Sequence, residues 1–245
     1  MTTSPSPAGP VAVITGASSG IGAATARALH AAGYRVALLA RRLDRLNSLA
    51  AELGEGAVAI EADVTSRDAL QAAAQRVKSE LGGTDVLVNN AGVMLLGSFG
   101  PDRDNDYRNM IGINLLGAIT ATEVFLDQLR DGGGDLINMS SVAGRTARPG
   151  AAVYAATKWG LIGFSDCMRQ ELLPDVRVTV VEPGYVATDL PTHITDSAAR
   201  ESTEELYSHI TVTPEDIAGV IVFILAQPRR MAVNEIVVRP SNQQH

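Results

Sequence analysis

Short apolar runs alternate with longer amphipathic stretches along most of the chain. The apolar runs are about four to six residues long, as expected for strands buried on both faces, and the longer stretches space their apolar residues as helices do. The predicted strands cover residues 11–15, 36–40, 58–61, 85–89, 135–140, 177–182 and 235–239. The predicted helices cover residues 21–32, 44–53, 67–81, 105–130, 154–172 and 214–226.

A helix separates each predicted strand from the next, which is typical of a parallel sheet with helices on both faces. We therefore expect residues 11–245 to form a single α/β domain with a doubly wound, Rossmann-type fold of about seven parallel strands. Residues 1–10 are rich in Pro, Ser and Thr, and we expect them to form a flexible tail.

Composition excludes several classes of protein. The 245 residues are 46% hydrophobic, which excludes intrinsic disorder, and a single cysteine excludes a disulfide scaffold. A net charge of −7 argues against nucleic acid as a partner. No uninterrupted apolar run approaches the roughly 18 residues of a membrane helix, and the N-terminus lacks a secretory pattern, so we expect a cytoplasmic protein. The four histidines form no ligand cluster, and no metal site is expected.

A glycine-rich segment, residues 15–22, lies between the first predicted strand and the first helix. Gly16, Gly20 and Gly22 would let the backbone turn sharply and approach a pyrophosphate at the helix N-terminus. The spacing is G-x-x-x-G-x-G, whereas the dinucleotide-binding fingerprint is G-x-G-x-x-G. An ordinary strand-to-helix turn therefore stays open as an alternative.

The same segment matches the G-x-S-x-G nucleophile elbow of α/β-hydrolases. In that alternative Ser18 is a nucleophile and His193 or His209 is its general base. The order of elements disfavours it, because this segment follows the first strand and no earlier strand is left to supply an oxyanion loop.

Tyr154 and Lys158 are four positions apart in a predicted helix and therefore lie on one face of it. An ammonium beside a phenol lowers the phenol pKa, so that the tyrosine could exchange a proton with a carbonyl or alcohol oxygen. The alternative is a surface tyrosine with a solvated lysine. The chemical interpretation is favoured because the chain has 18 arginines and only two lysines, Lys78 and Lys158.

Three further polar residues could serve such a site. Ser140 and Ser141 end the fifth predicted strand, at the sheet edge where ligands bind, and either hydroxyl could hold a substrate oxygen or simply form a turn. Asn114 lies in an apolar helical stretch, where its amide must be hydrogen-bonded. It is either a satisfied core amide or a group that holds a water or the main chain beside the site.

The end of the second strand bears on the form of a dinucleotide. An acidic residue at this position usually binds the adenine ribose hydroxyls and would repel a 2′-phosphate, but here the strand ends in Ala40. Arg41 and Arg42 follow, and a guanidinium matches a phosphate well. The sequence predicts NADP(H), and the alternative is two solvated arginines.

Taken together and in this order, these motifs resemble those of the short-chain dehydrogenase/reductase family over nearly the whole chain. The markers are the 15–22 glycine motif, Asp63-Val64, Asn89-Asn90-Ala91-Gly92, Asn114, Ser141, Tyr154-x-x-x-Lys158 and Pro183-Gly184. The family serine lies thirteen positions before the tyrosine, which selects Ser141 over Ser140.

The resemblance implies a catalytic tetrad. Tyr154 would be the general acid–base, and Lys158 would lower its pKa and bind the nicotinamide ribose. Ser141 would orient the substrate oxygen, and Asn114 would hold a water of the proton relay. The cofactor-binding residues would be Gly16, Ser18, Ser19, Gly20, Ile21, Gly22, Arg41, Arg42, Asp63, Val64, Asn90, Ala91, Gly92, Tyr154, Lys158, Pro183, Gly184, Val186 and Thr188.

The implied function is reversible hydride transfer between NADP(H) and a small carbonyl/alcohol pair, run as the reduction of an aldehyde or ketone. A protein that only senses NADP(H) is the non-catalytic alternative. Residues 94–97 and 234–240 resemble the clavulanic-acid dehydrogenase branch, which reduces an aldehyde with NADPH. The resemblance also implies a homotetramer, with a dimer as the alternative, and we expect residues 189–211 to form a lid over the substrate.

Overall fold

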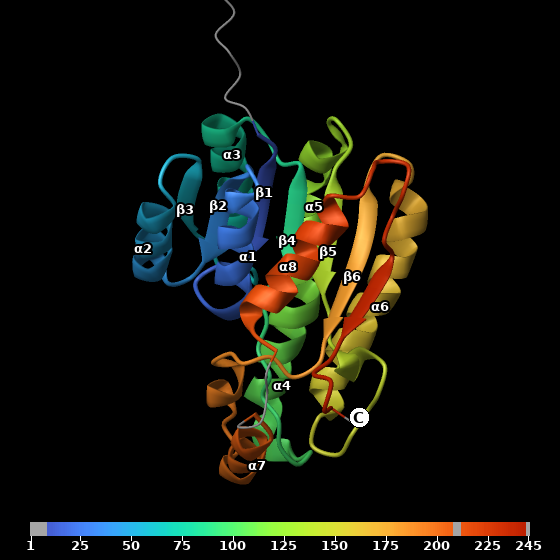
Figure 1. Cartoon of the computed structure of the whole chain (residues 1–245). Helices are drawn as coiled ribbons and strands as arrows, with labels where there is room; N and C mark the ends of the chain where they lie inside the picture. Colours follow the sequence, from blue (N-terminus) through green and yellow to red (C-terminus); the bar gives the residue numbers. More distant parts are fainter. Residues whose placement is uncertain (1–8, 208–211, 244–245) are drawn as a thin grey trace, which may run out of the picture.

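The computed structural model describes residues 9–207 and 212–243 and confirms the predicted doubly wound fold (Figure 1). One seven-stranded sheet has the order β3-β2-β1-β4-β5-β6-β7, and every neighbouring pair is parallel. The strands are β1 (Val11–Thr15), β2 (Arg35–Ala40), β3 (Ala57–Glu61), β4 (Val86–Asn89), β5 (Asp135–Met139), β6 (Arg177–Pro183) and β7 (Glu235–Val238). Residues 1–8, most of the tail that the sequence predicts to be flexible, lie outside the described part of the chain.

The helices cover both faces of this sheet. They are α1 (Gly20–Ala31), α2 (Leu43–Leu53), α3 (Arg67–Leu81), α4 (Asp104–Met110), α5 (Gly117–Arg130), α6 (Ala152–Leu172), α7 (Ser197–Tyr207) and α8 (Pro214–Leu225). Side chains of α1, α2 and α8 pack on one face, and side chains of α3, α5 and α6 pack on the other.

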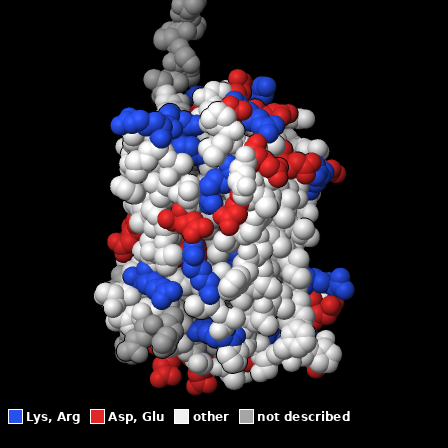
Figure 2. All heavy atoms as spheres, turned by 90° about the vertical axis from the view of Figure 1, so that its right-hand side faces the viewer, with Lys and Arg blue, Asp and Glu red and all other residues white. Residues whose placement is uncertain are grey.

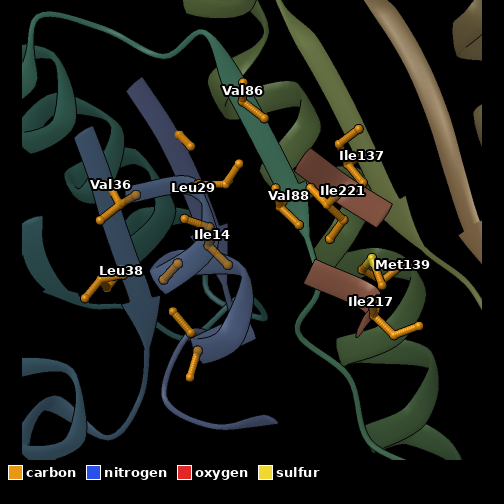
Figure 3. Close-up of a cluster of buried hydrophobic side chains, with 14 of the residues drawn as sticks. Ile14, Leu29, Val36, Leu38, Val86, Val88, Ile137, Met139, Ile217 and Ile221 are labelled. Carbon is orange, nitrogen blue, oxygen red and sulfur yellow. The ribbon is translucent and has the colours of Figure 1, made fainter. Parts of the chain in front are cut away.

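Alternation along the strands divides the core between the two faces. Ile14 and Val88 point toward α1 and α8, where they meet Leu29 and Ile221 (Figure 3). Neighbouring strand residues such as Val13 point to the opposite face and its helices. Both faces of the central strands are therefore dry, which is the physical reason why these strands form continuous apolar runs.

The helical run from Pro101 to Arg130 is long and apolar enough to span a membrane by length and composition. Polar residues are scattered along this run, so it contains no long uninterrupted apolar stretch. Phe125 and Leu129 of this run are fully buried in the core against the sheet. Such packing is that of a core helix, which passes the same test.

Two elements differ from the sequence prediction. The helix expected over 105–130 is divided, because residues Ile111–Leu116 form a π-helical turn between α4 and α5. The segment expected as a loop before residue 211 contains a short 3-10 helix, Leu190–His193, and α7. Thr203 is the one residue of α7 that is buried, so no apolar pattern marked it as a helix.

The order of the strands reverses at β1 and β4. β2 and β3 lie on one side of β1, whereas β5, β6 and β7 lie beyond β4. Connections leaving the carboxyl ends of β1 and β4 therefore separate to opposite faces and leave a crevice, the usual ligand site of such sheets. This is the lower edge of the sheet in Figure 1, beside α4 and α7.

Candidate active site

A single cavity of about 580 Å³ opens along this edge of the sheet. Of the residues that the sequence assigns to the site, all but Gly22 and Asn114 line it. These residues are Gly16, Ser18, Ser19, Gly20, Ile21, Arg41, Arg42, Asp63, Val64, Asn90, Ala91, Gly92, Ser141, Tyr154, Lys158, Pro183, Gly184, Val186 and Thr188. Segments far apart in sequence thus meet in one volume of ligand size.

The glycine turn has the backbone conformation that its residue types allow. Gly16 and Gly20 have φ values of +67° and +52°, in the left-handed region that favours glycine. A Cβ on Gly22 would come within 2.4 Å of the carbonyl oxygen of Gly16, so only glycine at this position lets α1 pack against the turn. The side-chain amide of Asn90 donates to the carbonyl oxygen of Thr15 at 3.0 Å and fixes the turn against β4.

Arg42 lies against the turn. One of its terminal guanidinium nitrogens donates to the hydroxyls of Ser18 and Ser19, at 2.8 Å each. Arg41 lies beside it, exposed, while Ala40 at the end of β2 is buried. Two guanidinium groups therefore border the end of the cavity nearest β2, where an acidic residue would exclude a phosphate.

Ser18 has no partner of the kind that a hydrolase needs. Its hydroxyl accepts both hydrogen bonds from Arg42, and no histidine in the described residues is hydrogen-bonded to it. Of the two candidate bases, His193 lines the cavity from the 3-10 helix before α7, and His209 lies outside the described residues. The geometry gives no support to the hydrolase alternative.

Ser141 and Tyr154 meet at the floor of the cavity. Ser141 follows β5 and caps the next 3-10 turn by accepting from the amide of Ala143 at 3.1 Å. Its hydroxyl donates to the carbonyl oxygen of Pro183 at 3.4 Å and is also hydrogen-bonded to the hydroxyl of Tyr154. Ser140 points the other way and donates to the carbonyl oxygen of Lys158 at 3.0 Å. The geometry therefore separates the two serines that local sequence left equivalent.

Lys158 is buried one helical turn from Tyr154. Its ammonium donates to the carbonyl oxygen of Met139 at 2.8 Å and lies 5.8 Å from the centre of the Tyr154 ring. Burial lowers the pKa of Lys158 to about 8. No carboxylate in the described residues pairs with it, so the cost of burying this charge is offset only by neutral partners.

Burial also raises the pKa of Tyr154, and the hydrogen bond with Ser141 and the charge of Arg148 oppose this rise. The net shift is thus opposite to the lowering that the sequence argument expected from Lys158. The ammonium lies beside the ring and donates to the carbonyl oxygen of Met139. A tyrosine with a raised pKa keeps its proton at neutral pH.

Asn114 lies in the π-helical turn and does not line the cavity. Its side-chain oxygen accepts from the amide of Val93 at 2.8 Å, and its nitrogen donates to the carbonyl oxygen of Val93 at 2.9 Å and to the hydroxyl of Thr157 at 3.3 Å. The amide is thus satisfied and holds the main chain of the loop after β4. A π-helical turn redirects a side chain, and such turns are frequent at functional sites.

Sequence reasoning missed three residues that line the cavity beside Tyr154. These are Arg148, Tyr185 and Tyr207. The rings of the two tyrosines meet edge to face, 5.4 Å between centres, and burial raises the pKa of Tyr207. All three come from connections or from the end of α7, where no periodic pattern directs attention to a single position.

A protein-family comparison matches residues 10–199 to the short chain dehydrogenase model. The chain is 37% identical over 238 residues to an uncharacterized oxidoreductase of Staphylococcus saprophyticus, covering 95% of this chain and 96% of the relative. Among solved structures, a closed serine dehydrogenase complexed with NADP+ is 30% identical, covers 96% of each chain and has a TM-score of 0.88. An alcohol dehydrogenase of the archaeon Thermococcus sibiricus, complexed with 5-hydroxy-NADP, is 31% identical, with 97% of this chain and 99% of that chain covered and a TM-score of 0.87.

The family match covers most of the chain, and the relatives and the solved structures align along nearly its full length. This chain belongs to the short-chain dehydrogenase family.

Proposed function

We propose that this protein interconverts a carbonyl compound and an alcohol with NADP(H), with Tyr154 as the general acid–base. The observation that carries the proposal is the hydroxyl of Tyr154, hydrogen-bonded to Ser141 at the floor of the cavity that also contains the glycine turn. A protein that only senses the cofactor would not need this constellation, whose Tyr154, Ser141 and Lys158 are all present.

The residues of the cavity fit a dinucleotide. A Cβ on Gly16 would come within 2.8 Å of the main chain of Ala91, so only glycine lets the turn pack this closely against the loop after β4. The free amide groups at the start of α1 favour an anion such as a pyrophosphate. When bound, the reduced nicotinamide supplies a hydride, which carries the two electrons of the reduction.

In the reduction, Tyr154 would donate its proton to the carbonyl oxygen of the substrate and would then regain a proton from solvent. Ser141 positions the carbonyl oxygen through its hydroxyl. Tyr154 is protonated at neutral pH, as a proton donor must be, because burial raises its pKa. The side chain of Asn114 accepts from the amide of Val93 and so positions the loop after β4. That it also binds a water of a proton relay stays a prediction.

The proposed cofactor form is NADP(H). Arg41 and Arg42 border the end of the cavity nearest β2, and Ala40 leaves out the acidic group that would repel a 2′-phosphate. Arg42 is already oriented by two serine hydroxyls, which reduces the entropy that it loses on binding a phosphate. The two solved neighbours with NADP⁺ and 5-hydroxy-NADP support the same form.

We propose that residues 189–207 act as a lid on the substrate end. Leu190, His193 and Tyr207 of this segment line the cavity. The hydroxyl of Thr195 donates to the carboxylate of Asp106 on α4 at 2.7 Å, an exposed tie that opening would break. Residues 208–211, the end of the lid as the sequence predicts it, lie outside the described part of the chain.

We also propose that the protein is a homotetramer in the cytoplasm. The family resemblance implies that the helices near residues 105–130 and 154–172 pair across one two-fold axis and that the C-terminal strand lies near another. Large apolar side chains are exposed there, Leu116 and Trp159 on the helical elements and Val237 on β7, and Phe223 is exposed on α8. Figure 2 shows the side of the molecule over α6 and β7, where uncharged atoms form a broad area between groups of charged residues. Closed two-fold symmetry would cover both apolar areas.

Replacing Tyr154 with Phe removes only the proposed acid. We expect kcat to fall by about 10²–10⁴-fold while the affinity for NADPH, measured by fluorescence titration, stays within about threefold. Tyr34→Phe, which removes a hydroxyl outside the cavity, serves as the matched control. A Tyr154→Phe variant that keeps more than about a third of the wild-type kcat contradicts the assignment.

The cofactor assignment predicts a preference for NADPH over NADH in kcat/KM. The double variant Ala40→Asp/Arg41→Ala should lose about 10- to 150-fold of its efficiency with NADPH and move toward NADH, because a charge-assisted hydrogen bond is lost and a repulsion is added. Arg45→Ala, in the first turns of α2 and outside the cavity, controls for the loss of charge. Equal use of both cofactors by the wild type would sink this assignment.

The assembly can be checked by analytical ultracentrifugation. We expect a species of about four times the 25.7 kDa chain mass, and Leu116→Glu should reduce it because a buried carboxylate is costly at an apolar interface. Leu43→Glu changes an exposed apolar residue on α2, away from these elements, and should leave the mass unchanged. A 25.7 kDa wild-type species at micromolar concentration would argue against the tetramer.

The buried charge of Lys158 should cost stability. Its pKa is about 8 in the fold against 10.5 for the unperturbed group, so the cost is complete below pH 8 and fades as the pH rises toward 10.5. We expect Lys158→Met to lose turnover yet to raise the free energy of unfolding at pH 7 by about 1–3 kcal/mol, because the buried charge is removed. The hydrogen bond that the Met139 carbonyl group loses reduces this gain. Urea unfolding at pH 7 and pH 10 measures both values, and the gain should shrink at the higher pH.

Lys78→Met is the matched control, because it replaces the other lysine of the chain, which is exposed on α3. It should change the free energy of unfolding little at either pH. A Lys158→Met variant less stable than the wild type at pH 7 would show that the ammonium is held by more than the contacts described above.

A further inference from the structure

Arg148 is a cation in the cavity for which the described residues provide no carboxylate partner. It lies in the connection between β5 and α6 and lines the cavity on the same side as Tyr154. In the described residues, no carboxylate oxygen lies within 4.0 Å of a guanidinium nitrogen of Arg148. Its neighbour in sequence Arg145, by contrast, is paired with the buried Glu182.

Aromatic and hydroxyl groups hold Arg148 in place. Its guanidinium lies 5.6 Å from the centre of the Tyr185 ring and donates to the hydroxyl of the same tyrosine. Tyr185 packs in turn against Tyr207 at the end of α7. These contacts orient the cation without neutralising its charge, so its remaining donors are available to a ligand.

The charge of Arg148 reaches the reaction centre. Arg148 lines the cavity together with Tyr154 and Tyr207, and its charge opposes the burial-induced rise in the pKa of both tyrosines. Arg41 and Arg42 border the opposite end of the cavity, beyond the glycine turn. The cavity therefore has one cationic region for the proposed cofactor phosphate and a separate one beside the tyrosine.

The start of α6 adds to this second region. α6 is 21 residues long, has no acidic residue in its first turn, and its N-cap residue Ala151, which lines the cavity, makes no side-chain capping bond. The positive end of its dipole is thus left without a negative side chain, whereas α8 begins with Glu215 and Asp216. Both features favour an anion at the substrate end.

Among the other groups that line this end, only Asp189 is acidic. It makes no ion pair with Arg148 within the 4.0 Å that defines one in the described residues. The cavity is also lined by neutral polar and histidine side chains, none of which carries a fixed negative charge: Thr146, Tyr185, Thr188, His193, Tyr207 and Gln243. A ligand carboxylate is the group that would complete the site.

We propose that Arg148 binds a carboxylate of the substrate, so that the protein acts on oxo acids and the corresponding hydroxy acids. This inference rests on the proposed function and narrows its substrate class. The carboxylate takes no part in the transfer: hydride adds to the carbonyl carbon, the proton of Tyr154 goes to the carbonyl oxygen, and the acid group stays bound and unchanged. A bidentate guanidinium–carboxylate contact also fixes the orientation of a small molecule.

The test uses two oxo acids and their neutral methyl esters, 3-oxobutanoate and 4-oxobutanoate each against its ester, with NADPH oxidation as the readout. In the wild type we expect kcat/KM for at least one acid to exceed that for its ester by about tenfold or more. In Arg148→Gln this ratio should fall at least about tenfold, mainly through KM of the acid, and Arg148→Lys should recover part of it.

Arg200→Gln is the matched control, because Arg200 is a lid arginine on α7 that does not line the cavity. It should leave the ratio of acid to ester unchanged. A second measurement uses compounds that are not themselves reduced. Butanoate should inhibit the reduction of 4-oxobutanoate by the wild type competitively, whereas butanamide should not. Arg148→Gln should raise the inhibition constant of butanoate by about tenfold.

The inference is overturned if both wild-type ratios are near one, or if Arg148→Gln lowers acid and ester equally. A rise in KM for NADPH in Arg148→Gln, with the ratio unchanged, would instead assign the residue to the cofactor. These outcomes leave the proposed function standing, because the esters are still reduced. If the wild type binds NADPH but none of the acids or esters supports NADPH oxidation, the proposed function fails and the inference fails with it.

Discussion

The junction between β1 and β4 is the contact on which the site depends. The hydroxyl of Thr15, fully buried, donates to the carbonyl oxygen of Val88 at 3.3 Å and accepts from the amides of Asn90 and Ala91 at 3.0 and 3.1 Å. One side chain thus fixes the carboxyl ends of the two strands at the point where their connections separate. The glycine turn, the loop after β4 and the crevice between them all follow from that register.

Much of this could be predicted because a parallel sheet converts sequence order into spatial order. The ends of its strands meet at one edge, so Ser141 after β5 and Asn90 after β4 had to lie near the glycine turn. Residues that act through irregular backbone escaped prediction. The π-helical turn around Asn114 depends on tertiary packing, and helix α7 buries too little to show a period. Arg148 lies in a connection, where position follows from no periodicity.

The chemistry of the site also conflicts with the stability of the fold. Tyr154 and Lys158 are less than 10% exposed, and burial shifts the pKa of each toward its neutral form. A sequence pattern shows that two groups are adjacent, but it cannot show how much water each has lost, and this is why the pKa of Tyr154 was predicted in the wrong direction. A buried tyrosine keeps its proton at neutral pH, as the proposed role of Tyr154 requires.

The local charge of the cavity differs in sign from the net charge of the chain. The chain has a net charge of −7, yet two guanidinium groups border one end of the cavity and a third lies beside Tyr154. A negative surface with a locally positive crevice repels polyanions in general but admits a small anion that can enter. Local cations within a negative protein therefore select ligands by size as well as by charge. A phosphorylated dinucleotide at one end and a short acid at the other satisfy both conditions, since each brings its charge to a cation that lacks a carboxylate partner in the described residues.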